Sequence, residues 1–291
     1  MKTLPALLAA HYTQRSTTVS YGLRVIRRNR ETGAALQTLG FTSHDRNVVV
    51  GGVTYLASPG IRCTSIVSTS GTAVGNLEVT TLNDESLFTR VGILNGIWRN
   101  AEFLLFRFNW TSPTDGIEEL TAGNLGEIQI RGSELRFELR DWRQYLQQPV
   151  GSNSTKTCRY RFGDAKCTKN ITAPPLRVTG TVTSVSSQNV FTDSARAEVA
   201  DFFGEGELGW TSGNNLDAWV KVKEFSSSTF TLVNSMWGQV QIGDTYIAIA
   251  GCRKRYEEDC GTKHSNTVNF GGEPHRRGVN SLTAAPGETQ T

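Results

Sequence analysis

Two short stretches decide how this chain folds: TCRYRFGDAKC at residues 157–167 and GCRKRYEEDCGTKHSNTVNFGG at residues 251–272. Each holds a pair of cysteines among basic residues, spaced C-x8-C in the first stretch and C-x7-C in the second. The intervening residues 168–251 contain segments with the period-two alternation of β-strands. Strands that leave one cysteine pair and return to the other can bring all four thiols together at the base of a β-domain.

The spacing alone leaves the chemistry of these four cysteines open. Disulfides conflict with an odd total of 5 cysteines and with the lack of a convincing secretory signal. Structural zinc sites usually use closer C-x2–4-C pairs, and iron–sulfur ligands often come in C-x2-C runs. Cationic neighbours such as Arg159 and Lys254 favour metal-binding thiolates, whereas the acidic run at 257–259 fits ordinary surface charge. The residues therefore favour a metal or cluster site over disulfides and over free thiols.

Composition excludes some classes of function. The formal net charge is +3, from 30 Lys and Arg against 27 Asp and Glu, which is too balanced for a nucleic-acid-binding surface. No apolar run approaches the roughly 20 residues that a transmembrane helix needs. The opening MKTLPALLAAHYTQ predicts a short amphipathic helix from Leu4 to about Tyr12, and Pro5 speaks against a cleaved signal peptide.

Period-two alternation predicts a mainly β fold in two domains. The boundary is expected in the polar stretch QQPVGSNSTKT, so the domains are 1–150 and 151–280, with a flexible tail at 281–291. Strands, a hairpin and a short helix are expected in the first domain at 18–28, 48–57, 76–82, 95–110, 125–141 and 142–146. Strands are expected in the second domain at 176–185, 219–225, 229–234 and 244–251. Turn clusters such as GEGELGWTSGNN, residues 204–215, are expected to separate them.

Other polar residues are weaker candidates for a site. Cys63 is interpreted as a small buried apolar side chain. His44 and Asp45 form a possible catalytic pair, but no nucleophile accompanies them and a turn-stabilising role is favoured. His264 and His275 flank the second cysteine pair and are alternative metal ligands. With four cysteines available, we expect the two histidines to lie beside the site or in solvent.

Several segments of the sequence, taken in chain order, resemble those of a known protein family. They are GFTSHDRNVVVGGVTYLASPGI (40–61), NLEVTTL (76–82), NAEFLLFRFNW (100–110), TCRYRFGDAKC (157–167), GELGWTSGNN (206–215), GDTYIAIAGCRKRYEEDC (243–260) and NTVNFGGEPHRRG (266–278). This series resembles the tail-tip hub proteins of long non-contractile-tailed phages and gene transfer agents, which include the iron–sulfur minor tail protein of lambda-like phages. The chain departs from that pattern at Glu273, where an apolar or aromatic residue is more common, and at Arg277, where proline is common.

The resemblance implies that Cys158, Cys167, Cys252 and Cys260 ligate a [4Fe–4S] cluster. The cluster would close an inserted C-terminal β-domain and have a structural role, because metal-binding free energy then becomes folding free energy.

The resemblance also implies a non-enzymatic homotrimer, assembled in the host cytoplasm and located at the virion tail tip. There it would connect the distal tail protein ring to the central fibre or receptor-binding protein and meet the tape-measure protein. The alternatives are a redox or electron-transfer protein that uses the same cluster, and a disulfide-stapled adhesion module.

Overall fold

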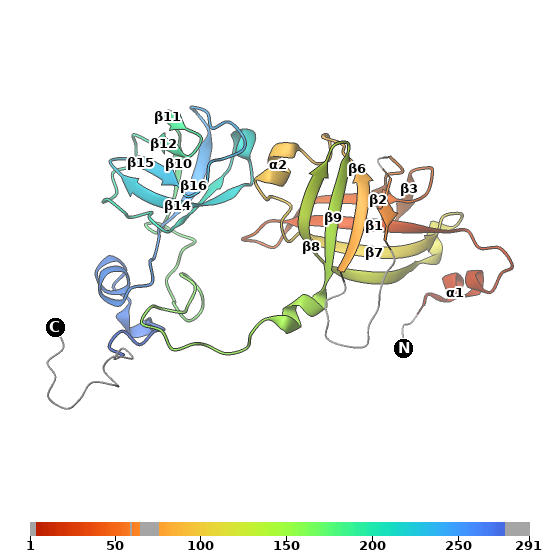
Figure 1. Ribbon diagram of the computed structural model, residues 1–291, viewed down its shortest axis with the longest axis horizontal. Helices are drawn as coiled ribbons and strands as arrows, with labels where there is room; N and C mark the ends of the chain where they lie inside the picture. The colour runs from red at the N-terminus through yellow and green to blue at the C-terminus, as the bar shows by residue number, and fades with distance from the viewer. Residues whose placement is uncertain (1–3, 59, 65–75, 277–291) are drawn as a thin grey trace. The chain divides into compact units, whose positions relative to one another are not determined.

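The computed structural model describes residues 4–58, 60–64 and 76–276. Contacts within the chain divide it into two units, Met1–Pro149 and Val150–Thr291, and each is described by itself. Both units consist mainly of antiparallel strands (Figure 1), so the prediction of a mainly β fold is confirmed. The tail predicted at 281–291 lies outside the described residues. Within the described part of the chain, no helix is long and apolar enough to cross a bilayer.

Unit 1 is organised around a curved sheet of seven strands in the order β2-β1-β7-β8-β9-β6-β5 (Figure 1). The strands of this sheet are β1 (Val19–Arg28), β2 (Ala35–Thr42), β5 (Arg62–Cys63), β6 (Asn76–Leu82), β7 (Glu102–Asn109), β8 (Ile117–Arg131) and β9 (Glu134–Asp141). The other elements are β3 (Val48–Val50), β4 (Val53–Tyr55), α1 (Ala6–Tyr12), α2 (Arg90–Leu94) and the 3-10 turns η1 (Pro113–Asp115) and η2 (Trp142–Gln147).

The strand β7 is buried on both faces. Phe103 and Leu105 point into the main core of unit 1. Leu104 and Phe106 alternate with them and pack on the opposite face, where the Tyr55 ring of the β3–β4 hairpin meets the Phe106 ring edge-on at 5.2 Å. Apolar side chains are therefore needed at consecutive positions, which explains why this strand has a nearly continuous apolar run instead of a strict alternation.

The predicted N-terminal helix is present as α1 and is fixed to the sheet at its C-terminal end. The Tyr12 hydroxyl donates to the Glu118 carboxylate of β8 at 2.8 Å. The backbone N–H of Thr18 donates to Nε2 of His11 at 2.9 Å. Polar contacts at the end of the helix thus supplement the packing of its single fully buried apolar side chain, Leu8.

The strands of unit 2 form one sheet in the order β10-β16-β13-β14-β15-β12-β11. They are β10 (Arg177–Thr181), β11 (Ser184–Ser187), β12 (Val190–Thr192), β13 (Glu207–Trp210), β14 (Trp219–Ser226), β15 (Thr229–Leu232) and β16 (Thr245–Ile249). The two end strands, β10 and β11, are consecutive in the chain. Between them, the backbone N–H of Val182 donates to the carbonyl of Asp244 beside β16. The backbone N–H of Thr183 donates to the carbonyl of Thr192 in β12. The sheet therefore closes on itself as a small barrel.

Aromatic rings fill this barrel. Its fully buried members are Phe191, Phe203, Trp210, Phe225, Phe230 and Tyr246. Neighbouring ring centroids in this group lie about 5 Å apart in edge-on, tilted and stacked arrangements, as between Phe191 and Phe230 at 5.1 Å. The one hydroxyl in the group, on Tyr246, donates to the buried Asp193 carboxylate at 2.7 Å. The barrel thus has an apolar core of its own.

The structure corrects the expectation for residues 204–215. Glu207–Trp210 is the strand β13, at the centre of the sheet, and not part of a turn cluster. Its glycine, Gly209, serves close packing, because a Cβ there would collide with the Trp219 ring of the neighbouring strand. The only 3-10 turn described within that stretch is η3 (Gly213–Asn215). The elements β2, α2 and β12 were also not predicted from the sequence.

Replacing Tyr246 by Phe is expected to destabilise unit 2 by about 1–2 kcal/mol, because a buried hydrogen bond to Asp193 is lost. The cost is limited, since the Asp193 carboxylate also accepts the backbone N–H of Thr181 and of Ala195. Denaturant unfolding of the full chain measures the change, with Tyr21→Phe at an exposed position of unit 1 as the control. Equal stabilities of the two variants would contradict this assignment.

Candidate cysteine site

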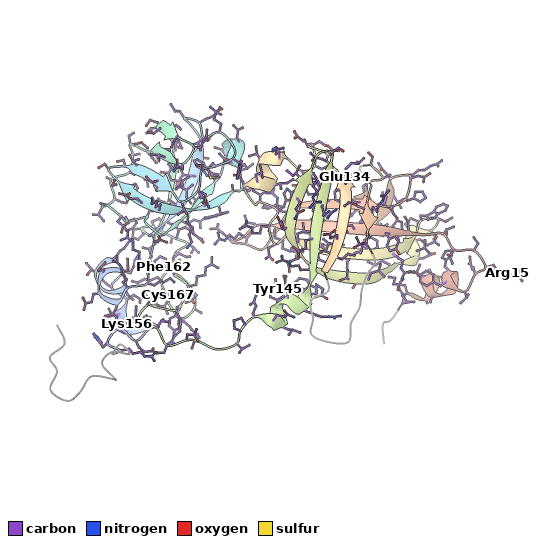
Figure 2. All side chains as sticks on the ribbon, in the orientation of Figure 1. Arg15, Glu134, Tyr145, Lys156, Phe162 and Cys167 are labelled. Atoms are coloured by element: carbon purple, nitrogen blue, oxygen red, sulfur yellow. The ribbon has the colours of Figure 1, made fainter. Side chains whose placement is uncertain are left out.

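The predicted site residues all lie in unit 2, outside the strands of the barrel. Cys158 and Cys167 belong to the irregular segment that precedes β10, and Cys252 follows β16. Cys260 lies in η4 (Tyr256–Lys263), a helical turn of π type. Figure 2 marks Cys167 and Phe162 in this part of unit 2, which comprises residues 150–176 and 251–276 and is called the cysteine region below.

The structure brings the four side chains together. All four thiols are free, and they line one small cavity, called the cysteine cavity. The other residues that line it are Tyr160, Phe162, Lys254, His264, Asn266 and Asn269. Segments that are remote along the sequence therefore meet at one place, as the two cysteine stretches suggested. Cys63 lies in unit 1 and is not part of the group.

For two of these thiols, Cys252 and Cys260, burial is the largest influence on the pKa. Burial raises the pKa of Cys252, and Lys254 acts in the opposite direction without cancelling that effect. Burial also raises the pKa of Cys260, and the neighbouring thiols of Cys158, Cys252 and Cys167 raise it further. The expectation that basic neighbours lower the pKa is thus wrong for these two thiols.

Hydrogen bonds hold the cysteine-bearing segments against one another. The backbone N–H of Cys158 donates to the carbonyl of Lys254 at 2.8 Å. The Gly271 N–H in turn donates to Sγ of Cys158 at 3.3 Å, and a Cβ at Gly271 would overlap the Tyr160 ring. Amide donors directed at sulfur are the kind of contact that tunes metal-bound thiolates.

Asn266 connects two of the cysteines. Its side-chain Nδ2 donates to the carbonyl of Cys167 at 2.6 Å and lies 3.7 Å from the Cys167 sulfur. Its backbone N–H donates to the Cys260 carbonyl at 2.7 Å, and its own carbonyl accepts from the Cys260 thiol at 3.1 Å. One side chain thus joins the segment before the barrel to the segment after it.

The turn that carries Cys167 is built around Asp164. Its carboxylate accepts the backbone N–H groups of Cys167 at 2.6 Å, Arg161 at 3.0 Å and Lys166 at 3.0 Å. The Cys167 hydrogen bond is the largest cause of the lowered pKa of Asp164, followed in the same direction by the Arg161 and Lys166 bonds. The turn is therefore fixed by local backbone contacts independently of any bound group.

His264 lies beside the cysteine cavity but is not solvated. Its Nε2 lies 2.9 Å from the carbonyl of Gly251, which requires the proton on Nε2. Burial lowers the pKa of His264, and its ring packs on Phe162 at 4.5 Å. In the described part of the chain Nδ1 is buried without a hydrogen-bond partner. His275 packs edge-on against Tyr256 instead.

Several of the basic residues are already paired. Arg255 contacts Glu258 and the buried Asp259 of η4, and Arg253 contacts Asp201. The Lys254 amine donates to the carbonyl of Tyr160. The acidic run of the second cysteine stretch thus neutralises part of the positive charge that the sequence places around the thiols.

The geometry differs from that of a single-ion site. Among the described residues no group of three His, Cys, Asp or Glu is arranged to hold one metal ion. Four thiolates around one zinc lie about 2.3 Å from the metal and hence about 3.8 Å from one another. In a cuboidal four-iron cluster each thiolate binds a different iron, so the sulfurs lie farther apart.

The other candidates take structural roles. His44 and Asp45 lie in a turn, with Nδ1 and Oδ1 3.0 Å apart, while the Arg46 N–H donates to the same Nδ1 at 3.0 Å. The His44 ring packs on Trp110 at 4.7 Å.

Glu273 is one of the two positions at which the chain departs from the family pattern. Its carboxylate accepts hydrogen bonds from Arg159 and from Ser154. An ion pair thus replaces apolar packing in the last loop. Arg277 lies outside the described residues.

Asn266→Ala is expected to loosen the cysteine region by removing both contacts of its Nδ2 with Cys167. Hydrogen–deuterium exchange of the full chain should accelerate about tenfold or more in residues 157–168, as the loss of roughly 1–3 kcal/mol implies. Asn214→Ala, which removes an exposed amide elsewhere in unit 2, serves as the control. Unchanged exchange in residues 157–168 would contradict the connecting role.

Cys63 gives a second prediction. Its side chain packs against the main core of unit 1, and burial raises the pKa of this thiol to about 11. The pH profile of iodoacetamide labelling, followed by mass spectrometry of the Cys63 peptide, should therefore rise only above about pH 10, whereas an exposed thiol reacts from about pH 8.5. Rapid labelling of the native chain at pH 8 would show that Cys63 is not buried.

Comparison with known proteins finds two family matches. A family described as baseplate hub protein, N-terminal attachment domain, matches residues 5–170, which is more than half of the 291 residues. A family described as phage conserved hypothetical protein BR0599 matches residues 201–279. The first match includes Cys158 and Cys167 and the second includes Cys252 and Cys260. No curated protein is similar enough to this chain to count as a match.

Among solved structures, a chain from a structure titled "Virion of native gene transfer agent (GTA) particle" has the same fold. The TM-score is 0.84 with 24% sequence identity, over 99% of this chain and 98% of that chain. At this identity the likeness establishes the fold, and it covers both the barrel and the cysteine region.

Proposed function

Because the chain belongs to the family of baseplate hub proteins and is thereby located in the virion tail, we propose that it is the structural hub of the tail tip. The observation that carries the proposal is the match of the attachment domain over residues 5–170. The shared fold with a gene transfer agent virion chain supports it. Hubs of this kind act by connecting parts, and the proposed role requires no catalytic residue.

In this role the chain connects the distal tail protein ring to the central fibre or receptor-binding protein, meets the tape-measure protein, and assembles as a homotrimer. Exposed apolar side chains at the end of unit 1 support a function in protein contacts. Trp142 and Tyr145 stack on each other at 5.8 Å in η2 and are 49% and 46% exposed, and Leu146 beside them is 72% exposed. Clustered exposed apolar groups of this kind are typical of protein interfaces.

We further propose that Cys158, Cys167, Cys252 and Cys260 hold a [4Fe–4S] cluster. The donor set fits, because four free thiols line one cavity together with the Tyr160 and Phe162 rings. The Gly271 and Asn266 donors near two of the sulfurs fit as well. When bound, the cluster would supply four iron–thiolate bonds and no reaction step.

Different residues around the thiols would position the individual ligands of such a group. Asp164 and Asn266 orient Cys167, and η4 orients Cys260. Phe162 packs against the His264 side chain, which is 6% exposed, at one wall of the cavity. Bonds to all four sulfurs would join both ends of the barrel-containing segment, so cluster binding contributes to folding. A redox protein with the same cluster would instead need a reversible potential and a partner that exchanges electrons with it.

Replacing the hub in tail-producing cells tests the proposal. In cells whose own copy of the gene is deleted, the wild-type chain should restore particles with complete tail tips, as seen by electron microscopy. Cys158→Ser should reduce complete tips and infectious or gene-transferring titre by at least about tenfold, because a cluster ligand and its folding free energy are lost.

Cys63→Ala is the matched control, since it removes the one thiol outside the cysteine region. It should retain most of the wild-type titre. Normal tails in cells without the chain would refute the hub function itself. Normal tails with Cys158→Ser would leave the hub function intact and refute the structural role of the cluster.

A further inference from the structure

Unit 2 has a second cavity, of about 460 Å³, between the cysteine region and the barrel. Its walls come from β13, β14 and β16 on one side and from the segments around Phe162 and Cys252 on the other. The volume is in the range of sites for small molecules. Because most of its charged lining residues are arginine or lysine, it is called the basic cavity below.

The charges that line the basic cavity are predominantly positive. Four basic side chains face two acidic ones: Arg161, Lys221, Arg253 and Lys254 against Glu205 and Glu207. Because Arg253 is paired with Asp201, which does not line the cavity, three cations remain against two carboxylates. The contact between Arg161 and Glu207 is long, at 4.0 Å, and the Arg161 side chain is 69% exposed. Such a pair is weak.

Lys221 contributes a charge that the protein leaves available. It lies on β14 with an exposed side chain, opposite Glu207 of β13 in the strand register, and it makes no ion pair with any residue in the described part of the chain. Lys223 lies two positions further along the same strand, is also exposed, and does not line the cavity. The two lysines thus differ mainly in their position relative to the cavity.

Cys252 lines both the basic cavity and the cysteine cavity. Its side chain is only partly buried. Phe162 and Lys254 also line both cavities, and Cys252 is the one cysteine among the lining residues of the basic cavity. Cations beside this position attract negative solutes by the local potential that they create.

We propose that the basic cavity admits and binds a small anion, of the carboxylate or oxyanion class, next to Cys252. That the anion lies beside a cluster rests on the proposed function. The preference for anions rests only on the charged residues that line the cavity. The competing explanation is that the basic residues only balance the negative charge of the cluster. That explanation predicts no preference between charged and neutral solutes.

Cluster removal by two chelators distinguishes the explanations. The anaerobically purified full chain is treated with EDTA, which is anionic, or with 2,2'-bipyridine, which is neutral, and the visible absorbance of the cluster is followed. Lys221→Glu should slow the loss caused by EDTA by about threefold to tenfold at low salt and change the loss caused by bipyridine by less than about twofold. Lys223→Glu should leave both rates near those of the wild type.

High salt should abolish the effect of Lys221→Glu on EDTA, because the interaction is screened. An equal effect of Lys221→Glu on both chelators would overturn the proposal in favour of charge balance. Equal effects of the two lysine variants would overturn it as well.

A protein purified without iron and sulfide would refute the cluster but still test the cavity. In that case the modification of Cys252 is measured by peptide mass spectrometry with an anionic disulfide, Ellman's reagent, and a neutral one, 4,4'-dithiodipyridine. Lys221→Glu should slow only the anionic reagent, by a similar factor of about threefold to tenfold. Equal slowing of both reagents, or of neither, would overturn the anion site.

Discussion

The convergence of four cysteine side chains is the constraint on which the cysteine region depends. Residues 150–176 and 251–276 contain no strand, and their described helical turns are the two short elements η4 and η5 (Thr267–Asn269). Among the large fully buried side chains of the protein none comes from this region. Its order rests on hydrogen bonds such as those of Asp164 and Asn266, which position the thiols around one cavity.

The barrel of unit 2 differs in this respect. Phe191, Phe230 and Tyr246 pack in a closed sheet, so its stability comes from burial of aromatic surface. Both ends of the barrel segment, at Arg177 and Ile249, lead directly into the cysteine region. A group that joins Cys167 to Cys252 therefore joins the entry and exit of the barrel.

The structural elements that depend on local sequence patterns could be predicted from the sequence. The alternation in β1 and the two glycines of the β3–β4 hairpin predicted their elements correctly, and the two cysteine stretches indicated that remote thiols meet. The strand β13 was missed because Gly206 and Gly209 have the appearance of turn residues, whereas their role is to admit neighbouring backbone and the Trp219 ring. The π-type turn η4 and the connection made by Asn266 depend on tertiary contacts that no local pattern reveals. The proposed identity of a group held by the four thiols came only from the family resemblance.

Iron and acid-labile sulfide analysis of the anaerobically purified chain tests the central claim most directly. The account predicts about four iron and four sulfide ions per chain, with both lost together when any one of the four cysteines is replaced by serine and retained in Cys63→Ala. Zinc without sulfide, or cysteine peptides linked by disulfides under non-reducing conditions, would contradict it.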